Sequence, residues 1–396
     1  MLEDICELIV DCKNRTPPEV SPGEEPVGYA VGTPHIIDGR ITLSGAKRVS
    51  RSTFDTWTAR AVPQEGDVVL TREAPVGRVG RVENGMKICL GQRTMLLRPK
   101  VQRTDSRYLH YFLLSPLIQG LLHSHGSGST VAHLRVAQVR ELQIPDVPIL
   151  AEQKRIGALL GALDDKIAAN ERISATAVLL ADAEFHSRSA GLSFGPRTFG
   201  DSAVVVGGGT PSTKVDEYWG GEIAWATPSD VTALPSPYLF ATNRVITGEG
   251  LDNCASKLFP ENSIFMTSRA TIGAFALPQV PAAVNQGFIV VLPPNESMRW
   301  WLLHEMRSRV AEMHSLANGS TFLELSRKNF KAMPIRLPGE EVIAGFAQIA
   351  RALHLRAAKA ADESRTIANL RDTLLPQLMS GKLRVRDAER IVENAV

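Results

Sequence analysis

The chain has 396 residues, of which 44% are hydrophobic and 22% charged, and its formal net charge is +2. This composition supplies apolar side chains for buried cores and excludes wholesale disorder, and the length predicts two to three domains. No apolar run approaches the ~18–20 residues that cross a bilayer, and the charge balance is too even to identify a nucleic-acid partner by itself.

The N-terminal stretch and the cysteines predict a protein of a reducing compartment. Residues 1–15, MLEDICELIVDCKNR, are acidic from the third position and lack a basic start before an apolar core, so we expect no signal peptide. The cysteines show no CxxC spacing, which argues against a zinc site or a disulfide framework and favours the cytoplasm. They are Cys6, Cys12, Cys89 and Cys254.

The first globular part, 1–148, is predicted to be an α+β domain. Short segments of strand character with frequent Gly and Pro come first, and a helical stretch follows at 105–122. From Arg72 to Arg107 there are nine basic and three acidic residues, an excess that the matching stretch of the second half lacks. The excess of basic residues therefore favours an anionic partner for the first half and gives no such indication for the second.

A long helix is predicted at 149–190, after the first domain. No Pro interrupts the run from Ala151 to Ser189, and Pro148 stands just before it, where a helix start tolerates proline. Apolar residues recur at heptad-like spacing. The apolar positions are Ile156, Leu159, Leu163, Ile173, Ala177 and Leu180, and the polar interruptions are Lys166 and Asn170. The Gly- and Pro-containing segment 191–197 is predicted to be a linker.

The second half, with its globular part at 198–338, repeats the first. Five pairs of matching segments occur in the same order, at offsets that drift only from 196 to 191 residues, as small loop deletions produce. The pairs are DVVLTREAPVG (67–77) with SIFMTSRATIG (263–273), Thr33-Pro34 with Thr227-Pro228, Thr16-Pro17 with Thr210-Pro211, Leu90-Gly91-Gln92 with Val284-Asn285-Gln286, and SGSTVAHL (127–134) with NGSTFLEL (318–325). We therefore expect an α+β protein with two pseudo-symmetric domains.

A second long helix is predicted at 339–381, before a C-terminal tail at 382–396. Its apolar positions are Phe346, Ile349, Leu353, Ala360, Ile367, Leu370 and Leu374, with Arg356 and Glu363 as polar interruptions. Pro376 should kink the last turn. Each helix of about 40 residues would be ~55–60 Å long, and alone it would leave its apolar stripe in water. We therefore expect the two helices to pack antiparallel, with the polar seam residues fixing their register.

Such a layout would hold the two domains apart on a pair of rods. Two domains about one DNA turn apart, ~34 Å, could contact the same side of a duplex, with the helix pair setting the distance. Heptad periodicity alone is equally typical of a dimerisation or scaffolding coiled coil without DNA, and that alternative stays open.

Two segments resemble the specificity subunits of Type I restriction–modification systems. IPDVPILAEQKRIGALLGALDDKIAANE (144–171) resembles the central conserved region of that family, and LRDTLLPQLMSGKLRV (370–385) resembles its distal conserved region. The second copy reads LPGEEVIAGFAQI at 337–349 and lacks the Pro-x-x-x-Glu-Gln that opens the first helix. The resemblance covers nearly the whole chain.

The resemblance implies a sequence-specific, non-catalytic subunit that reads a bipartite DNA target, one half-site per target-recognition domain. It implies partners as well: two copies of an adenine-N6 methyltransferase subunit, which would bind S-adenosylmethionine, and a motor–nuclease subunit that can join them. The setting implied is a bacterial or archaeal cytoplasm. The residues expected to dock a partner are Glu152, Gln153, Asp164 and Asp165.

Catalytic motifs do not support the other alternative, a stand-alone DNA-modifying enzyme. LPPNE at 292–296 has the wrong order for the Asn/Asp-Pro-Pro-aromatic motif of adenine methyltransferases, and no phosphate-binding GxxxxGK[ST] loop exists. Three histidines near the first Gly-Ser-Thr loop lack a clear fourth ligand, so we expect no metal. They are His123, His125 and His133.

Candidate DNA contacts come from the polar residues that follow the repeated strands and from the Gly-Ser-Thr loops. Phosphates are bound by Arg, Lys and small hydroxyls, whereas base edges are read by Arg, Gln and Asn. In the first copy the candidates are Thr71, Arg72, Arg78, Gln92, Arg93, Ser127, Ser129, Thr130 and Arg135. In the second copy they are Thr267, Ser268, Arg269, Asn285, Gln286, Asn318, Ser320, Thr321, Arg327 and Lys328.

Overall fold

The computed structural model describes residues 1–13, 15–126, 133–318 and 323–395. These residues form two compact units. Unit 1 consists of Met1–Asp165 and Ile367–Val396, and unit 2 consists of Lys166–Thr366. The chain passes between the units within two long helices, α6 (Leu150–Ser189) and α13 (Glu340–Met379). None of the helices in the described ranges is both long and apolar enough to cross a membrane.

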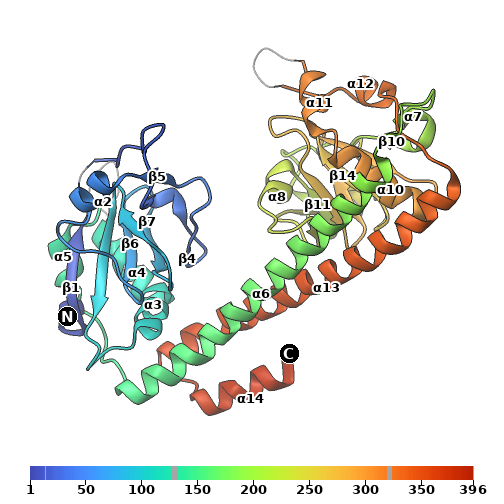
Figure 1. Cartoon of the computed structure of the whole chain (residues 1–396). Coiled ribbons are helices and arrows are strands. Elements are labelled where there is room, and N and C mark those ends of the chain that lie inside the picture. The colour runs from blue at the N-terminus through green and yellow to red at the C-terminus, as the bar shows by residue number, and fades with distance from the viewer. Residues whose placement is uncertain (14, 127–132, 319–322, 396) are drawn as a thin grey trace. The chain divides into compact units, whose positions relative to one another are not determined.

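Unit 1 contains an antiparallel sheet with the strand order β1-β9-β6-β7 and a three-stranded sheet with the order β5-β2-β8 (Figure 1). Their strands are β1 (Cys6–Asp11), β9 (Thr94–Pro99), β6 (Val68–Arg72), β7 (Val76–Arg81), β5 (Lys47–Val49), β2 (Gly28–Val31) and β8 (Ile88–Leu90). Val69 and Leu96 pack with Leu90 in a core that joins the two sheets. Because strand residues alternate between faces, Leu70 points to the opposite side, toward α3 (Ser106–Leu114) and α4 (Pro116–Gly126).

Smaller elements complete unit 1. They are α1 (Leu2–Ile5), η1 (Thr33–His35), β3 (Ile36–Ile37), β4 (Arg40–Ile41), α2 (Arg51–Trp57), α5 (Val136–Arg140) and α14 (Val385–Ala395). The segment expected to be a tail, 382–396, therefore contains a helix. Val385 and Ala388 of α14 are buried, and Glu389 lies 3.8 Å from Arg155 of α6.

Unit 2 repeats the strand order of unit 1. Its main sheet has the order β10-β17-β14-β15-β12, and the smaller sheet has the order β13-β11-β16. The strands are β10 (Val204–Val206), β17 (Phe288–Leu292), β14 (Ile264–Thr267), β15 (Phe275–Pro278), β12 (Tyr238–Leu239), β13 (Val245–Ile246), β11 (Trp219–Ala226) and β16 (Ala282–Val284). Strands β11 and β16 are parallel, as β2 and β8 are. The expected internal duplication is therefore confirmed, and the fold class is the predicted α+β.

The core of unit 2 lies on both faces of the main sheet. Phe265 packs toward the smaller sheet, whereas Ile264 and Met266 belong to the core formed with the helices, where Trp301 and Phe185 are fully buried. The helices and turns of this unit are α7 (Phe199–Ser202), η2 (Asp216–Tyr218), α8 (Pro228–Thr232), α9 (Gly248–Asp252), α10 (Glu296–Arg307), α11 (Val310–Ser315) and α12 (Arg327–Ala332).

The most similar detail of the two units is the turn after the central strand. The Thr71 hydroxyl donates to the Pro75 carbonyl at 2.6 Å, and the Thr267 hydroxyl donates to the Thr271 carbonyl at 2.5 Å. The alanine three residues after each threonine has positive φ, 53° in one copy and 58° in the other. An alanine in the left-handed backbone conformation costs about 1 kcal/mol. Because both copies keep such an alanine, we infer that the geometry of this turn is needed in both units.

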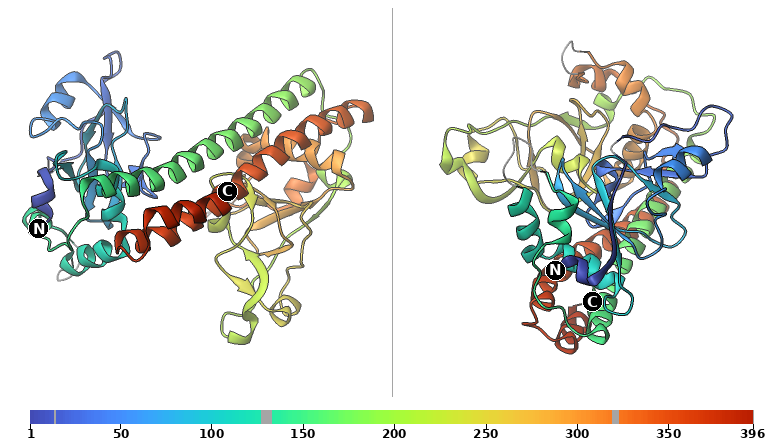
Figure 2. Two further views of the ribbon diagram at one scale, coloured as in Figure 1. Left: turned by 90° about the horizontal axis from the view of Figure 1, so that it is seen from below. Right: turned by 90° about the vertical axis from the view of Figure 1, so that its left-hand side faces the viewer.

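The long helices contact each other antiparallel within each unit (Figures 1 and 2). In unit 2 the rings of Phe185 and Phe346 lie 5.6 Å apart, and Lys166 forms a 3.0 Å ion pair with Glu363. Asn170 donates to the same carboxylate at 3.0 Å. Three of the four polar residues expected at the seam therefore meet there, whereas Arg356 is exposed.

The seam differs in register from the predicted apolar stripe. Leu180 and Ile349, which we expected there, are 54% and 39% exposed. One series of buried positions in α6 has three-and-four spacing: Ile156, Leu160, Leu163, Ile167, Asn170, Ser174, Ala177 and Ala181. Several of them are small residues, and Ala350, Ala357 and Ala360 of α13 are buried as well.

Candidate nucleic-acid interface

A polar cavity of about 890 Å³ lies in unit 2 at the carboxyl ends of strands of both sheets. Five of the predicted contact residues line it, although they come from three distant stretches of the sequence. They are Ser268 and Arg269 after β14, Gln286 after β16, and Arg327 and Lys328 at the start of α12. The folding of the repeated strands thus gathers these side chains at one surface.

The charge at this cavity is predominantly basic. Its charged lining residues are Arg269, Arg327, Lys328, Lys331, Asp201 and Glu324. Arg269 is neutralised by a 2.9 Å ion pair with Glu324, whereas both residues that open α12, Arg327 and Lys328, are exposed. Hydrogen bonds from Thr198 lower the pKa of the Asp201 carboxyl, which keeps it anionic at the edge of the cavity. Arg327, Lys328 and Lys331 therefore supply the excess positive charge.

Local backbone structure holds these cations in place. The Ser326 hydroxyl accepts a 3.1 Å hydrogen bond from the Asn329 amide and so caps α12 at the residue before Arg327. The Arg327 guanidinium lies against Gly207, where a Cβ would come within 3.2 Å of the guanidinium carbon. Lys331 was not predicted from the sequence, although its spacing of four residues from Arg327 places both on one helix face.

Two predicted DNA contacts, Thr71 and Thr267, are corrected by the structure. Both side chains are fully buried, and their hydroxyls are bonded inside the repeated turn. Neither can reach a phosphate. The turn instead fixes the direction of the chain after the strand, and this is why the same residue occurs in both copies. Ser268, the next residue in the second copy, is 3% exposed at the cavity wall.

The Arg72 guanidinium is occupied within unit 1, and its contact with DNA stays a prediction. Its Nε donates to the Leu134 carbonyl at 2.9 Å, and one terminal nitrogen lies 3.0 Å from His133 Nε2. The other lies 3.4 Å from the Asp11 carboxylate. The side chain is 16% exposed. Arg72 therefore ties the segment after the first Gly-Ser-Thr loop to β6 and β1.

The remaining candidates of unit 1 are accessible. Arg78 is exposed and donates to the carbonyls of Thr33 and Ile36, both at 3.3 Å. Arg93 is exposed, and its Nε lies 3.9 Å from Glu73. Gln92 is partly exposed, and Arg135 is exposed. Contact of these four residues with DNA stays a prediction.

Two further candidates of unit 2, Asn285 and Asn318, form hydrogen bonds with nearby backbone groups. The Asn285 carbonyl oxygen of the side chain accepts from the Gly287 amide at 2.8 Å and closes the turn between β16 and β17. Asn318 is exposed and pairs through its backbone with Glu324 at 3.0 and 2.9 Å. Five of the predicted loop residues lie outside the described residues: Ser127, Ser129, Thr130, Ser320 and Thr321.

The residues predicted to dock a partner divide into two kinds. Gln153 is 1% exposed, and its amide bonds to the Asp105 N–H and to the Arg103 and Pro148 carbonyls, so it fastens the start of α6 to unit 1. Asp164 is 20% exposed and pairs with Arg371 of α13 at 2.6 Å. The burial of Gln153 argues against its contact with a partner, whereas the contact of Asp164 stays a prediction.

Glu152 and Asp165 are exposed on α6, with side-chain exposures of 36% and 72%. Asp165 reaches Arg107 at 3.4 Å. Their contact with a partner stays a prediction.

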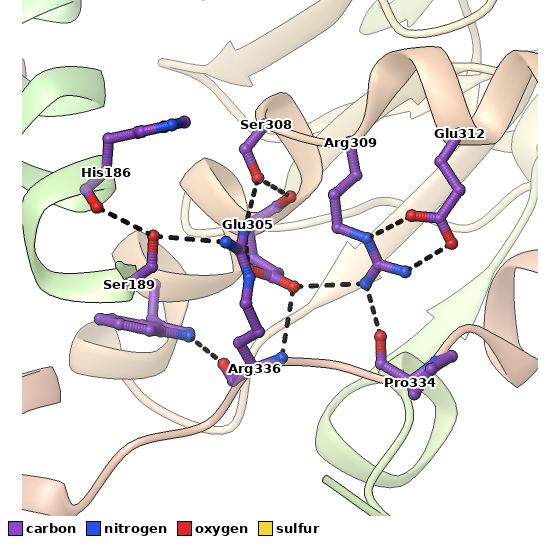
Figure 3. Close-up of polar contacts among 9 residues, drawn as sticks. His186, Ser189, Glu305, Ser308, Arg309, Glu312, Pro334 and Arg336 are labelled. Carbon is purple, nitrogen blue, oxygen red and sulfur yellow. Dashed lines mark hydrogen bonds and ion pairs between the residues drawn. The ribbon is translucent and has the colours of Figure 1, made fainter. Parts of the chain in front are cut away.

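A buried ion network fixes the helix pair to the sheet domain of unit 2 (Figure 3). Glu305 of α10 is fully buried and pairs with Arg309 at 3.2 Å and with Arg336 at 2.9 Å. Arg336 lies in the segment before α13 and also reaches the Ser189 hydroxyl at the end of α6, at 3.4 Å. Glu312 accepts two further bonds from Arg309. One carboxylate thus links the ends of both long helices to the domain.

The part of the chain that the structure describes contains no group of three His, Cys, Asp or Glu side chains that could hold a metal ion. The cavity of unit 2 offers cations, amides and hydroxyls instead. This chemistry suits hydrogen bonding to phosphates and base edges.

Comparison with known proteins gives a consistent result. Residues 1–177 and 194–354 each match the family model described as Type I restriction modification DNA specificity domain. The chain is 36% identical over 143 residues to the Type I restriction enzyme MjaIX specificity subunit of Methanocaldococcus jannaschii, covering 36% of this chain and 33% of that protein. It is 29% identical over 149 residues to the EcoR124I/EcoR124II specificity subunit of Escherichia coli, covering 36% of each. The matched segments thus span about a third of these curated relatives.

Among solved structures, the S subunit of a Type-I restriction-modification system from M. genitalium has a similar fold. The TM-score is 0.57 at 14% sequence identity, and the match covers 95% of this chain and 94% of that one. The two chains therefore share a fold.

Proposed function

Because the chain belongs to the Type I restriction–modification DNA specificity family, we propose that it is a sequence-specific DNA-binding subunit in which each unit reads one half of a bipartite site. The single observation that carries this proposal is the cavity of unit 2. Arg327, Lys328 and Lys331, cations that suit phosphates, line the same cavity as Gln286, whose amide suits a base edge. Unit 1 presents Gln92 and Arg93 at the corresponding turn.

The two units would read different sequences. They share strand order and the Thr-Ala-Gly turn, yet the residue after Gln92 in unit 1 is Arg93, whereas the residue after Gln286 in unit 2 is Gly287. Fixed backbone with changed side chains is the arrangement that alters specificity without altering docking. We infer an asymmetric target with two half-sites of different sequence.

The spacing between the half-sites would depend on α6 and α13. The chain passes between the units only within these helices, and polar pairs such as Lys166 with Glu363 hold their register. A change in helix length would therefore change the spacer that the protein prefers.

In this proposal the chain has no catalytic role of its own and acts in the cytoplasm together with partner subunits. An adenine-N6 methyltransferase, present in two copies and carrying S-adenosylmethionine, would supply the chemistry, and a motor–nuclease subunit could join. Glu152 and Asp165 are the accessible acidic residues near the start of α6 that would contact such a partner.

Selection from a duplex library tests this function. The full chain would be incubated with duplexes that carry two randomised blocks separated by spacers of several lengths, and bound molecules would be sequenced. We expect two short, different motifs at one preferred spacer, and affinity that falls steeply as salt rises because phosphate contacts release counterions. Binding without enrichment of any sequence, or no binding, would contradict the proposal and favour a scaffold without DNA.

A further inference from the structure

A threonine–glutamine hydrogen bond occurs at the same place in both units. In unit 2 the Thr210 hydroxyl donates to Gln286 Oε1 at 2.6 Å, and in unit 1 the Thr16 hydroxyl donates to Gln92 Oε1 at 3.3 Å. The partners are 76 residues apart in both copies. Most other polar positions differ between the copies, so a shared polar pair at the candidate interface points to a shared task.

The sequence builds this pair through close backbone packing. The segment Gly207-Gly208-Gly209 leads to Thr210, and a Cβ on Gly208 would lie 2.0 Å from the Val284 carbonyl oxygen at the end of β16. The Gly209 amide donates to that same carbonyl at 3.0 Å. Only glycine permits this approach, which brings Thr210 next to Gln286, two residues beyond Val284.

The hydrogen bond is not what anchors the segment. The residues after the threonines, Pro17 and Pro211, are buried, whereas Thr16 and Thr210 are exposed. A solvent-exposed hydrogen bond adds little to stability, because water competes for both partners. The segment is therefore held by the prolines and by its backbone contacts, and a purely structural reason for the hydroxyl is weak.

The hydroxyl does fix the orientation of the glutamine amide. A free glutamine rotates about its last bond and can present either its oxygen or its NH₂ group. With Oε1 held by the threonine, Nε2 is left to donate. Gln286 is exposed on the wall of the basic cavity, which Arg269 and Arg327 also line.

Building on the proposed function, we propose that the two Thr–Gln pairs are preset hydrogen-bond donors that read one base pair in each half-site. Gln286 and Gln92 would be the specificity-determining residues, and Thr210 and Thr16 would be positioning residues. A donor NH₂ selects a base edge that offers acceptors, such as the N7 and O6 of guanine in the major groove. The neighbouring cations would bind the flanking phosphates.

The test uses the full chain, the duplex library and matched variants. Gln286→Ala should reduce the preference at one base pair of the second half-site by about five- to hundredfold. Thr210→Val removes the donor at equal size and should lose part of the same preference, whereas Thr210→Ser should restore it. The first half-site should keep its sequence preference in all three variants, which makes it an internal control. Gln92→Ala should show the reverse pattern.

The outcomes separate this inference from the proposed function. If the wild-type chain enriches two motifs but Gln286→Ala and Thr210→Val leave every preference unchanged, the Thr–Gln inference is wrong and the proposed function stands. If Thr210→Val lowers affinity for all sequences equally, together with the thermal midpoint, the pair is a structural tether and the inference also fails. If the wild-type chain enriches no sequence, both proposals fail.

Discussion

Removing the cations of α12 should weaken DNA binding in a way that depends on salt. The change combines Arg327→Ala, Lys328→Ala and Lys331→Ala, which line the cavity of unit 2. Arg269 is left in place because its charge is already paired with Glu324. Alanine is the best helix former, so α12 should persist.

The expected magnitude follows from counterion release. Each phosphate contact contributes about 0.9 to the slope of log K against log salt, so three lost contacts should make the slope shallower by about 2.7. Between about 50 and 200 mM salt, the affinity of the wild-type chain should therefore fall roughly 40-fold more than that of the variant.

Fluorescence anisotropy with a labelled duplex over a salt series measures this slope. Lys359→Ala on α13 is the matched control, because Lys359 is exposed and outside the cavity. Its slope should equal that of the wild type. An unchanged slope in the triple variant, or an equal decrease in the control, would refute the assignment of the phosphate contacts to α12.

Three further predictions concern stability and spacing. Glu305→Gln should destabilise unit 2 by about 3–5 kcal/mol because it leaves the largely buried Arg336 guanidinium without its carboxylate partner. Glu312→Gln, with its side chain 43% exposed, should cost less than about 1 kcal/mol in chemical denaturation. Burial lowers the pKa of His110 to about 4, below the ~6.5 of an unfolded chain, so its contribution to stability is full above pH ~6.5 and is lost as the pH falls toward 4. The free energy of unfolding should therefore decrease between pH 7.5 and 5, and His110→Phe should remove roughly 2 kcal/mol of that decrease. An identical pH profile in both proteins would contradict this. One heptad inserted after Asn170 in α6 and before Glu363 in α13 adds about 10 Å and should lengthen the selected spacer by about three base pairs; an unchanged spacer would exclude the helices as the element that sets it.

The sequence predicted the features that are local or repeated. The duplication was visible because the buried Thr71 and Thr267 and the glycines of their turns recur at nearly constant offset. The long helices were visible from the absence of Pro between Ala151 and Ser189 and from the Gly and Pro that follow. The signals for the helix ends lie within a few residues of those ends. The duplication is recognised because short motifs recur along the chain.

The errors and the missed contacts concern residues whose partners are distant in the sequence. Asp164 pairs with Arg371, 207 residues away, and Gln153 bonds to a loop about 50 residues earlier, so these contacts left no local sign. The helix seam was misassigned because large residues such as Leu180 were preferred over the smaller Ala181, although close helix packing selects the smaller side chain. The buried Thr71 was interpreted as a surface contact for the same reason: burial depends on tertiary neighbours.

The measurement that tests the central claim most directly compares selected DNA motifs between one variant in each unit. Arg93→Gln changes unit 1 and Gln286→Ala changes unit 2, and both side chains are exposed, so the fold should be retained. We predict that each variant relaxes only one of the two motifs, a different one in each case, at an unchanged spacer. If either variant weakens both motifs equally, the two units do not read separate half-sites and the account is contradicted.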